Sequence, residues 1–109
     1  MLVLNRFVVA PDAADAFTAR AHAALEALAA RPGYVGGQLT RGLDEPSTWV
    51  LVTEWESVGT YRRALGAYDV KVTATPLLAE SVDEPSAFEP LATVAPGGAV
   101  EVRRSDRAS

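Results

Sequence analysis

A few polar and aromatic side chains in apolar surroundings carry the chemistry that this sequence could support. Asn5 interrupts an apolar run, and burying its amide costs free energy unless the amide is hydrogen-bonded. Trp55 ends a second apolar run and Tyr61 follows it, with Tyr34 and Tyr68 flanking them in the sequence. Such groups around an apolar cavity suit a flat, sparsely polar ligand. We therefore predict a site for a small aromatic molecule. The structural alternative for each residue is core packing or a local hydrogen bond.

Other kinds of site lack the residues that they need. His22 is the one histidine, and it falls on the polar face of a predicted helix with Glu26 one turn later. This placement argues against a Ser-His-Asp triad and against a histidine metal site. Cysteine is absent, no phosphate-binding glycine loop occurs, and no pair of carboxylates stands out as acid and base. The sequence therefore predicts no metal ion.

Composition narrows the class of protein. The chain has 109 residues, of which 49% are hydrophobic, and a net charge of −4, so one globular domain is expected. No basic patch in the folded region suggests a nucleic-acid partner, and no apolar run approaches the ~18 residues of a membrane span. The N-terminus lacks the charged region of a signal peptide. Together with the absence of cysteine, this predicts a cytoplasmic protein.

Hydrophobic periodicity and turn residues predict the elements that would position the site. Four strands are expected, over residues 2–10, 34–43, 48–56 and 86–94. Helices are expected over 13–30, 57–65 and 68–75. The order β-α-β-β-α-β is the split βαβ arrangement of a ferredoxin-like α+β fold, with a four-stranded antiparallel sheet.

Several residues are predicted to begin, bend or end these elements. Asp12 and Ser57 are expected to cap the first and second helical regions. Gly36, with its neighbouring glycine, suggests a bulge in the second strand, and Gly66 and Pro76 should interrupt the second helical region. The domain is expected to span residues 1–94. Residues 95–109 are predicted to form a C-terminal tail that is either flexible or pairs with a partner subunit.

Two of the strands are apolar on both faces. The first carries Leu2, Leu4 and Val8 on one face and Val3, Phe7 and Val9 on the other. The third carries Val50 and Val52 on one face and Trp49, Leu51 and Trp55 on the other. Two helices can cover one face of such a sheet, so we predict that a second copy covers the other face in a homodimer. Arg6 and Glu54 share that second face and could pair at it.

Four segments carry a resemblance to a known family: Asn5, Arg31-Pro32-Gly33-Tyr34-Val35, Asp44-Glu45-Pro46 and Thr53-Glu54-Trp55-Glu56-Ser57. Over residues 2–94 the chain resembles the antibiotic biosynthesis monooxygenase (ABM) family. The resemblance implies a dimeric α/β-barrel. One branch of the family oxidises aromatic anthrone-type polyketides with O₂ and without a cofactor. That branch uses a strand Trp, an Asn four residues before it and a Tyr six residues after it.

The resemblance implies a site for such a monooxygenase. Trp55 and Tyr61 match the Trp and the Tyr, and Leu51 stands at the Asn position, where Asn5 from the first strand could substitute. Trp55 would stack on the substrate, and Asn5, Tyr61 and Arg62 would steady the developing oxyanion. The apolar walls of the substrate pocket are expected to be Phe7, Phe17, Leu51 and Leu65. Tyr68 is expected to flank the pocket. No cofactor is expected.

Two alternatives remain open. A haem-degrading branch of the family has a strand Asn, which Asn5 matches, but Ala64 and Thr73 stand where its Trp and its haem-ligating His are expected. Haem breakdown is therefore disfavoured. The loss of these residues and of the Asn at Leu51 favours the second alternative. This is a non-enzymatic dimeric domain of the same fold that binds a small molecule or has an auxiliary role.

Overall fold

The computed structural model of the protein describes residues 1–104. The main elements are β1 (Leu2–Val8), α1 (Ala14–Ala29), β2 (Tyr34–Arg41), β3 (Thr48–Trp55), α2 (Val58–Leu65), α3 (Tyr68–Thr73), α4 (Thr75–Leu78) and β4 (Ala87–Phe88). A short hairpin of β5 (Ala92–Thr93) and β6 (Glu101–Val102) follows. Within these residues no helix is long and apolar enough to cross a membrane.

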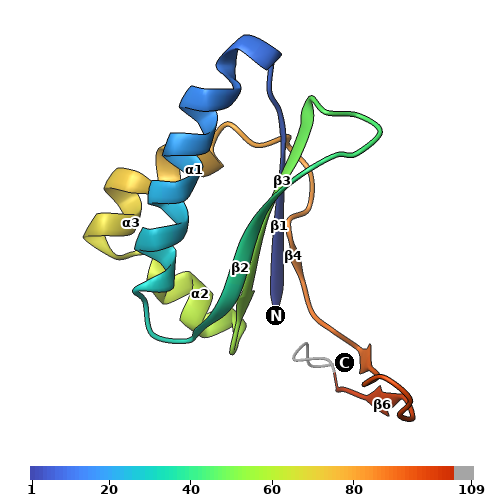
Figure 1. Ribbon diagram of the computed structural model, residues 1–109. Helices are drawn as coiled ribbons and strands as arrows, with labels where there is room; N and C mark the ends of the chain where they lie inside the picture. Colours follow the sequence, from blue (N-terminus) through green and yellow to red (C-terminus); the bar gives the residue numbers. More distant parts are fainter. Residues whose placement is uncertain (105–109) are drawn as a thin grey trace.

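The first four strands form one antiparallel sheet in the order β2-β3-β1-β4. This is the predicted ferredoxin-like α+β arrangement, in which β1 lies beside both β3 and β4. The helices all lie on one face of the sheet, and the opposite face is left uncovered by the chain (Figure 1). In the register of the central pair, Asn5 lies opposite Leu51 and Phe7 lies opposite Trp49.

The core lies between the sheet and the helices, and the predicted alternation along the strands is confirmed. Val3 and Phe7 of β1 are buried, whereas Leu4 and Val8 between and beyond them are exposed on the open face. Val9, directly after β1, is buried as well. The other buried apolar residues come from the helix-facing side of β3 and from the helical region: Trp49, Leu51, Trp55, Phe17, Ala21, Ala24, Leu28, Ala64, Val70, Ala74 and Leu77.

The start of α1 differs from the sequence prediction. Asp12 does not cap α1, since the N-cap residue is Ala13 and no side chain makes a capping hydrogen bond there. The reason is Pro11, whose fixed φ begins a 3₁₀ turn over Pro11–Ala13 that leads the chain into the helix. In the second helical region, Gly66 ends α2 as predicted. Pro76 instead lies in the first turn of α4, where its missing N–H costs no hydrogen bond.

The C-terminal part of the sheet is shorter than predicted. β4 comprises two residues instead of the whole range 86–94, because Pro90 has no N–H with which to continue a ladder. The chain then forms the β5–β6 hairpin, which hangs beyond the end of the sheet (Figure 1). The prediction that residues 95–109 form a tail that is either flexible or paired with a partner subunit stays a prediction. Its residues 105–109 lie outside the described part of the chain.

The loop that follows α1 packs closely against the start of α2. Gly33 has a φ of 88°, in the left-handed region that favours glycine. The carbonyl oxygen of Gly33 accepts a hydrogen bond of 2.8 Å from the backbone N–H of Glu56. A Cβ on Gly33 would lie 2.3 Å from the Cβ of Thr60. Thr60 and Ser57 form the capping box that starts α2, so the Ser57 cap is confirmed.

We expect Gly33→Ala to destabilise the fold by about 1–3 kcal/mol, because the methyl group strains the left-handed backbone and collides with Thr60. Gly36→Ala is the matched control. Gly36 follows the predicted β-bulge, which is observed between Tyr34 and Gly36, and nothing lies within 4 Å of the position that a methyl group would occupy there. This control should stay within about 0.5 kcal/mol of the original protein. Urea unfolding followed by tryptophan fluorescence measures both, and equal losses would contradict the close-approach argument.

Candidate active site

Trp55 and Tyr61 are brought together at the end of β3 and the start of α2. Their ring centroids lie 5.5 Å apart, and Tyr34 meets Trp55 edge-on at 5.3 Å from the other side. The Nε1 of Trp55 donates a 2.9 Å hydrogen bond to Oγ1 of Thr53. Trp55 is only 1% exposed. Trp55 is nevertheless among the residues that line a cavity of about 410 Å³ beside the N-terminus. Stacking of a ligand on Trp55 stays a prediction.

An apolar groove opens beside Tyr61. It has a volume of about 530 Å³ and is lined by Tyr61, Leu65, Lys71, Thr75, Leu78 and Ala79. These residues come from α2, α3 and α4 and from the residue that follows α4. The volume lies within the range that ligand pockets usually show, roughly 300–1,000 Å³. We take this groove, which we call the Tyr61 groove, as the candidate site.

Tyr61 brings a hydroxyl to the lining of the groove. Burial raises the pKa of Tyr61 above its ordinary value, so the phenol stays protonated at neutral pH. Among residues 1–104 nothing forms a hydrogen bond with this hydroxyl. Tyr61 can therefore donate a hydrogen bond to an oxygen atom of a ligand in the groove.

Asn5 is the second predicted polar residue, and it lies on the helix-facing side of β1. Its side chain is 9% exposed, and no other described residue forms a hydrogen bond with it. The polar atoms of Asn5 keep some contact with solvent, because among the described residues only Nε of Arg31 is a fully buried side-chain nitrogen or oxygen without a hydrogen-bond partner. Asn5 lies opposite Leu51, under the helices and away from the residues that line the groove.

The predicted aromatic walls form a separate cluster. The ring centroids of Phe7 and Phe17 lie 5.0 Å apart, and those of Phe17 and Trp49 lie 5.4 Å apart, both edge-to-face. Trp49 and Trp55 are six residues apart on β3, which corresponds to about 20 Å along a strand. Phe7 and Phe17 are therefore core residues at the opposite end of the sheet from the Tyr61 groove.

The other predicted pocket residues are divided between core, groove and surface. Leu51 is 1% exposed and lies in the core, whereas Leu65 lines the groove one turn after Tyr61. Arg62 is exposed on α2, and Tyr68 is 79% exposed at the start of α3. Neither of these two lines the groove, and their roles at a site stay predictions.

Sequence reasoning missed the half of the groove that α3 and α4 supply. Lys71, Thr75 and Leu78 line it, and their separations of four and three residues are those of neighbours on one helical face. That spacing was a usable signal. The spacing was not decisive, because Lys71 and Thr75 are polar residues. Only the tertiary structure shows that this helical face lines a groove together with Tyr61.

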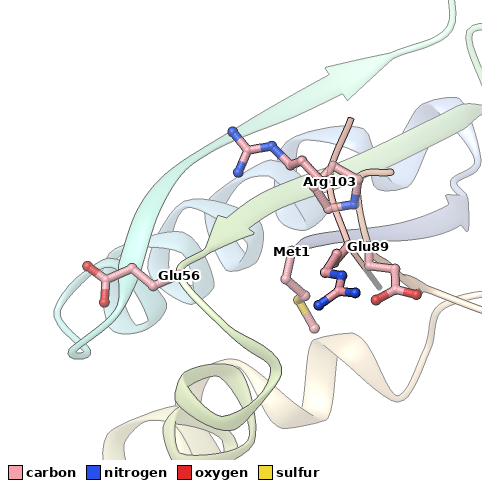
Figure 2. Close-up of a pocket in the computed structure, with 6 residues that line it drawn as sticks. Met1, Glu56, Glu89 and Arg103 are labelled. Atoms are coloured by element: carbon pink, nitrogen blue, oxygen red, sulfur yellow. The ribbon is translucent and has the colours of Figure 1, made fainter. Parts of the chain in front are cut away.

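Two further cavities, of about 320 and 410 Å³, adjoin each other between the N-terminus and the β5–β6 hairpin. Both are lined by Met1, Glu56, Pro90 and Arg103. Figure 2 shows the smaller one, with Met1 near Glu89, while the carboxylate of Glu56, just after β3, points away from these two residues. Their walls are more polar than the Tyr61 groove and depend on the hairpin. No group of three His, Cys, Asp or Glu side chains in residues 1–104 could hold a metal ion.

Comparison with known proteins identifies the family. The family model described as antibiotic biosynthesis monooxygenase matches residues 1–74, which include Trp55 and Tyr61. The chain belongs to the antibiotic biosynthesis monooxygenase family. No curated protein matches the ABM chain.

Solved structures agree with this assignment. The chain is 30% identical to SnoaB from Streptomyces nogalater, described as a cofactor-independent oxygenase, with a TM-score of 0.64 over 74% of this chain and 82% of that one. Rv0793 from Mycobacterium tuberculosis shares 23% identity and a TM-score of 0.68, over 86% of this chain and 97% of that one. A conserved protein from Methanosarcina mazei shares 20% identity and a TM-score of 0.65, over 79% and 84% of the two chains. The last two likenesses show the fold alone.

The raised pKa of Tyr61 predicts how stability changes in alkaline solution. In the unfolded chain the phenol ionises near its ordinary pKa of about 10, whereas the folded protein holds the proton to higher pH. The free energy of unfolding should therefore fall as pH rises through the unfolded pKa toward the folded one. In Tyr61→Phe this contribution is absent, while that of Tyr34, whose pKa burial also raises, remains. Urea unfolding between about pH 8 and 11 should show a shallower decline for Tyr61→Phe, and identical slopes would contradict the burial of this hydroxyl.

Proposed function

We propose that the protein is a cofactor-independent monooxygenase that oxidises an aromatic polyketide-like anthrone or phenol with O₂. The observation that carries the proposal is the protonated, unpartnered hydroxyl of Tyr61 at an apolar groove, with the Trp55 ring behind it. An apolar site with one or two hydrogen-bond donors suits a flat substrate whose oxygen gains negative charge during the reaction. The similarity to SnoaB, described as a cofactor-independent oxygenase, supports the same activity class.

The proposed reaction needs no covalent bond between the protein and the substrate. An anthrone methylene carbon loses a proton, and the resulting carbanion gives its electrons to O₂. One oxygen atom becomes the new carbonyl of the quinone, and the other leaves as water with the two methylene hydrogens. Tyr61 would donate a hydrogen bond to the substrate oxygen on which the carbanion's charge is delocalised.

Asn5 would assist from the strand. Its unpaired amide is nine-tenths buried on the same side of the sheet, and a ligand that entered beneath α2 would satisfy it. Arg62 and Tyr68, both exposed, would take part only if the helical side closed over the substrate. Trp55 would then stack on the ligand after a shift of Tyr61.

Oxygen uptake in the presence of dithranol tests this site. Removing one donor to a developing oxyanion usually lowers kcat by about 10²–10³-fold, and we expect a loss of that order for Tyr61→Phe. Asn5→Ala and Trp55→Phe should each lower the rate as well. His22→Ala is the control, because His22 is exposed on α1 and outside the groove. Turnover that is unaffected by all three site variants would refute the assignment.

A non-enzymatic role in small-molecule binding is the second candidate. Its support is that Leu51 replaces the expected Asn and that Trp55 is shielded by Tyr34 and Tyr61. The haem-degrading role is weaker still, because Ala64 is buried in the core and Thr73 ends α3. Binding of an anthrone by the groove without any oxygen uptake would favour the binding role.

We further propose that the working form is a cytoplasmic homodimer. Leu4 is 37% exposed and Val8 is 68% exposed on the face of the sheet that no helix covers (Figure 1). A contiguous apolar face of this kind is unusual on a monomer. Arg6 does not need a partner from the second copy, because its guanidinium forms a 2.7 Å ion pair with Glu84 at the edge of the same face.

The β5–β6 hairpin would be part of the same interface. A two-stranded hairpin is marginally stable by itself, and each of these strands has two residues. Its apolar side chains at Leu91, Val94, Val100 and Val102 are 56–84% exposed. The hairpin borders the open face, since Leu2, Thr93 and Arg103 line one cavity. A second copy packed on that face would cover the hairpin too, and residues 95–109 would then act as an interface segment.

Val52→Asp should disrupt the dimer. Val52 lies on the open face of β3, so the variant would place an uncompensated charge at the centre of the interface. Val72→Asp makes the same change at a position that is 57% exposed on α3, and it should leave the dimer intact. Sedimentation equilibrium at micromolar concentration distinguishes dimer from monomer, aggregate or insoluble protein. An original protein that sediments as a monomer near 11.5 kDa would refute the dimer.

A further inference from the structure

Lys71 gives the Tyr61 groove a positive charge. Of the six described residues that line the groove, Lys71 is the one with a charged side chain. It lies on α3, and Tyr61, which lines the same groove, lies on α2. The remaining lining includes Leu65, Leu78 and Ala79, so the one cationic residue of the groove lies among apolar residues.

No described acidic side chain neutralises Lys71. The two ion pairs among residues 1–104 join Arg6 to Glu84 and Arg20 to Glu80. Glu80 follows the groove residue Ala79 directly in sequence, but its carboxylate is held by Arg20 through two hydrogen bonds of 3.1 and 2.5 Å. Asp69 lies two residues before Lys71 on α3, about 200° away around the helix.

The polar groups of the groove are mostly hydrogen-bond donors. Thr75 lies one helical turn after Lys71 and presents a hydroxyl. Tyr61 presents a phenol that stays protonated, and the ammonium of Lys71 has three N–H donors and no acceptor. Together these groups match an oxygen atom that carries negative charge on an otherwise apolar ligand.

We propose that the Tyr61 groove selects aromatic ligands that carry an anionic oxygen, a phenolate or a carboxylate, and that Lys71 determines this selection. The proposal deepens the proposed function and rests on it only for the identity of the groove as the ligand site. It also answers a question that the groove raises: its lining includes no carboxylate or imidazole that could act as a base. A phenolic substrate bound as its anion is already electron-rich, so less deprotonation is left for the protein.

The selection can be measured by binding, without turnover. The two probes are 8-anilinonaphthalene-1-sulfonate, which is anionic, and N-phenyl-1-naphthylamine, which has the same rings and no charge. Fluorescence titration of each probe should show that Lys71→Gln weakens binding of the anionic probe about tenfold, the size expected for a hydrogen bond to a charged group. Binding of the neutral probe should change less than about twofold. Lys71→Arg should restore most of the affinity for the anionic probe.

Arg63→Gln is the matched control, because it removes one positive charge from the exposed side of α2 outside the groove. It should leave both affinities unchanged. Equal losses for the two probes in Lys71→Gln, equal losses in Lys71→Gln and Arg63→Gln, or no preference of the original protein for the anionic probe would each overturn the proposal. Failure of oxygen uptake with intact charge selection would instead refute only the oxygenase function.

Discussion

The position of the candidate site depends on one close contact, between the backbone of Gly33 and the side chain of Thr60. Thr60 completes the capping box of α2 with Ser57, so the loop that enters β2 also decides where α2 begins. Tyr61 is the next residue, and its ring therefore packs against Trp55. Since a Cβ at position 33 has no space, this geometry requires glycine there for steric as well as conformational reasons.

The two faces of the sheet differ because the helices of the chain cover only one of them (Figure 1). On the covered face, Phe7 and Phe17 are buried in the hydrophobic core, with their ring centroids 5.0 Å apart. The groove forms where the shorter helices α2, α3 and α4 meet at an edge. On the open face, apolar residues remain exposed, and a second copy is the simplest way to cover them. The proposed interface and the proposed site thus lie on opposite sides of the sheet.

A cofactor-free oxygenase needs few protein groups. These are an apolar groove, a hydrogen-bond donor for the developing oxyanion and a group that binds the ionised substrate. Tyr61 and Lys71 would supply the last two from facing helices, and Asn5 would add a buried amide from β1. Neither the Asn5 amide nor the Tyr61 hydroxyl forms a hydrogen bond with a described residue, so both keep their hydrogen-bonding capacity for water or a ligand.

Local patterns in the sequence determined the order of elements, the strand faces, the Ser57 cap, the bulge before Gly36 and the pairing of Trp55 with Tyr61 through the family resemblance. These features depend on neighbours within a few residues or on the period of two along a strand. Tertiary structure alone decided three things: that Phe7 and Phe17 join Trp49 in the core, that Tyr68 faces solvent, and that Lys71 and Thr75 line one groove with Tyr61. Each depends on how helices pack after the chain has turned back on itself, and the apolar character of a residue does not reveal whether its neighbours leave a space beside it.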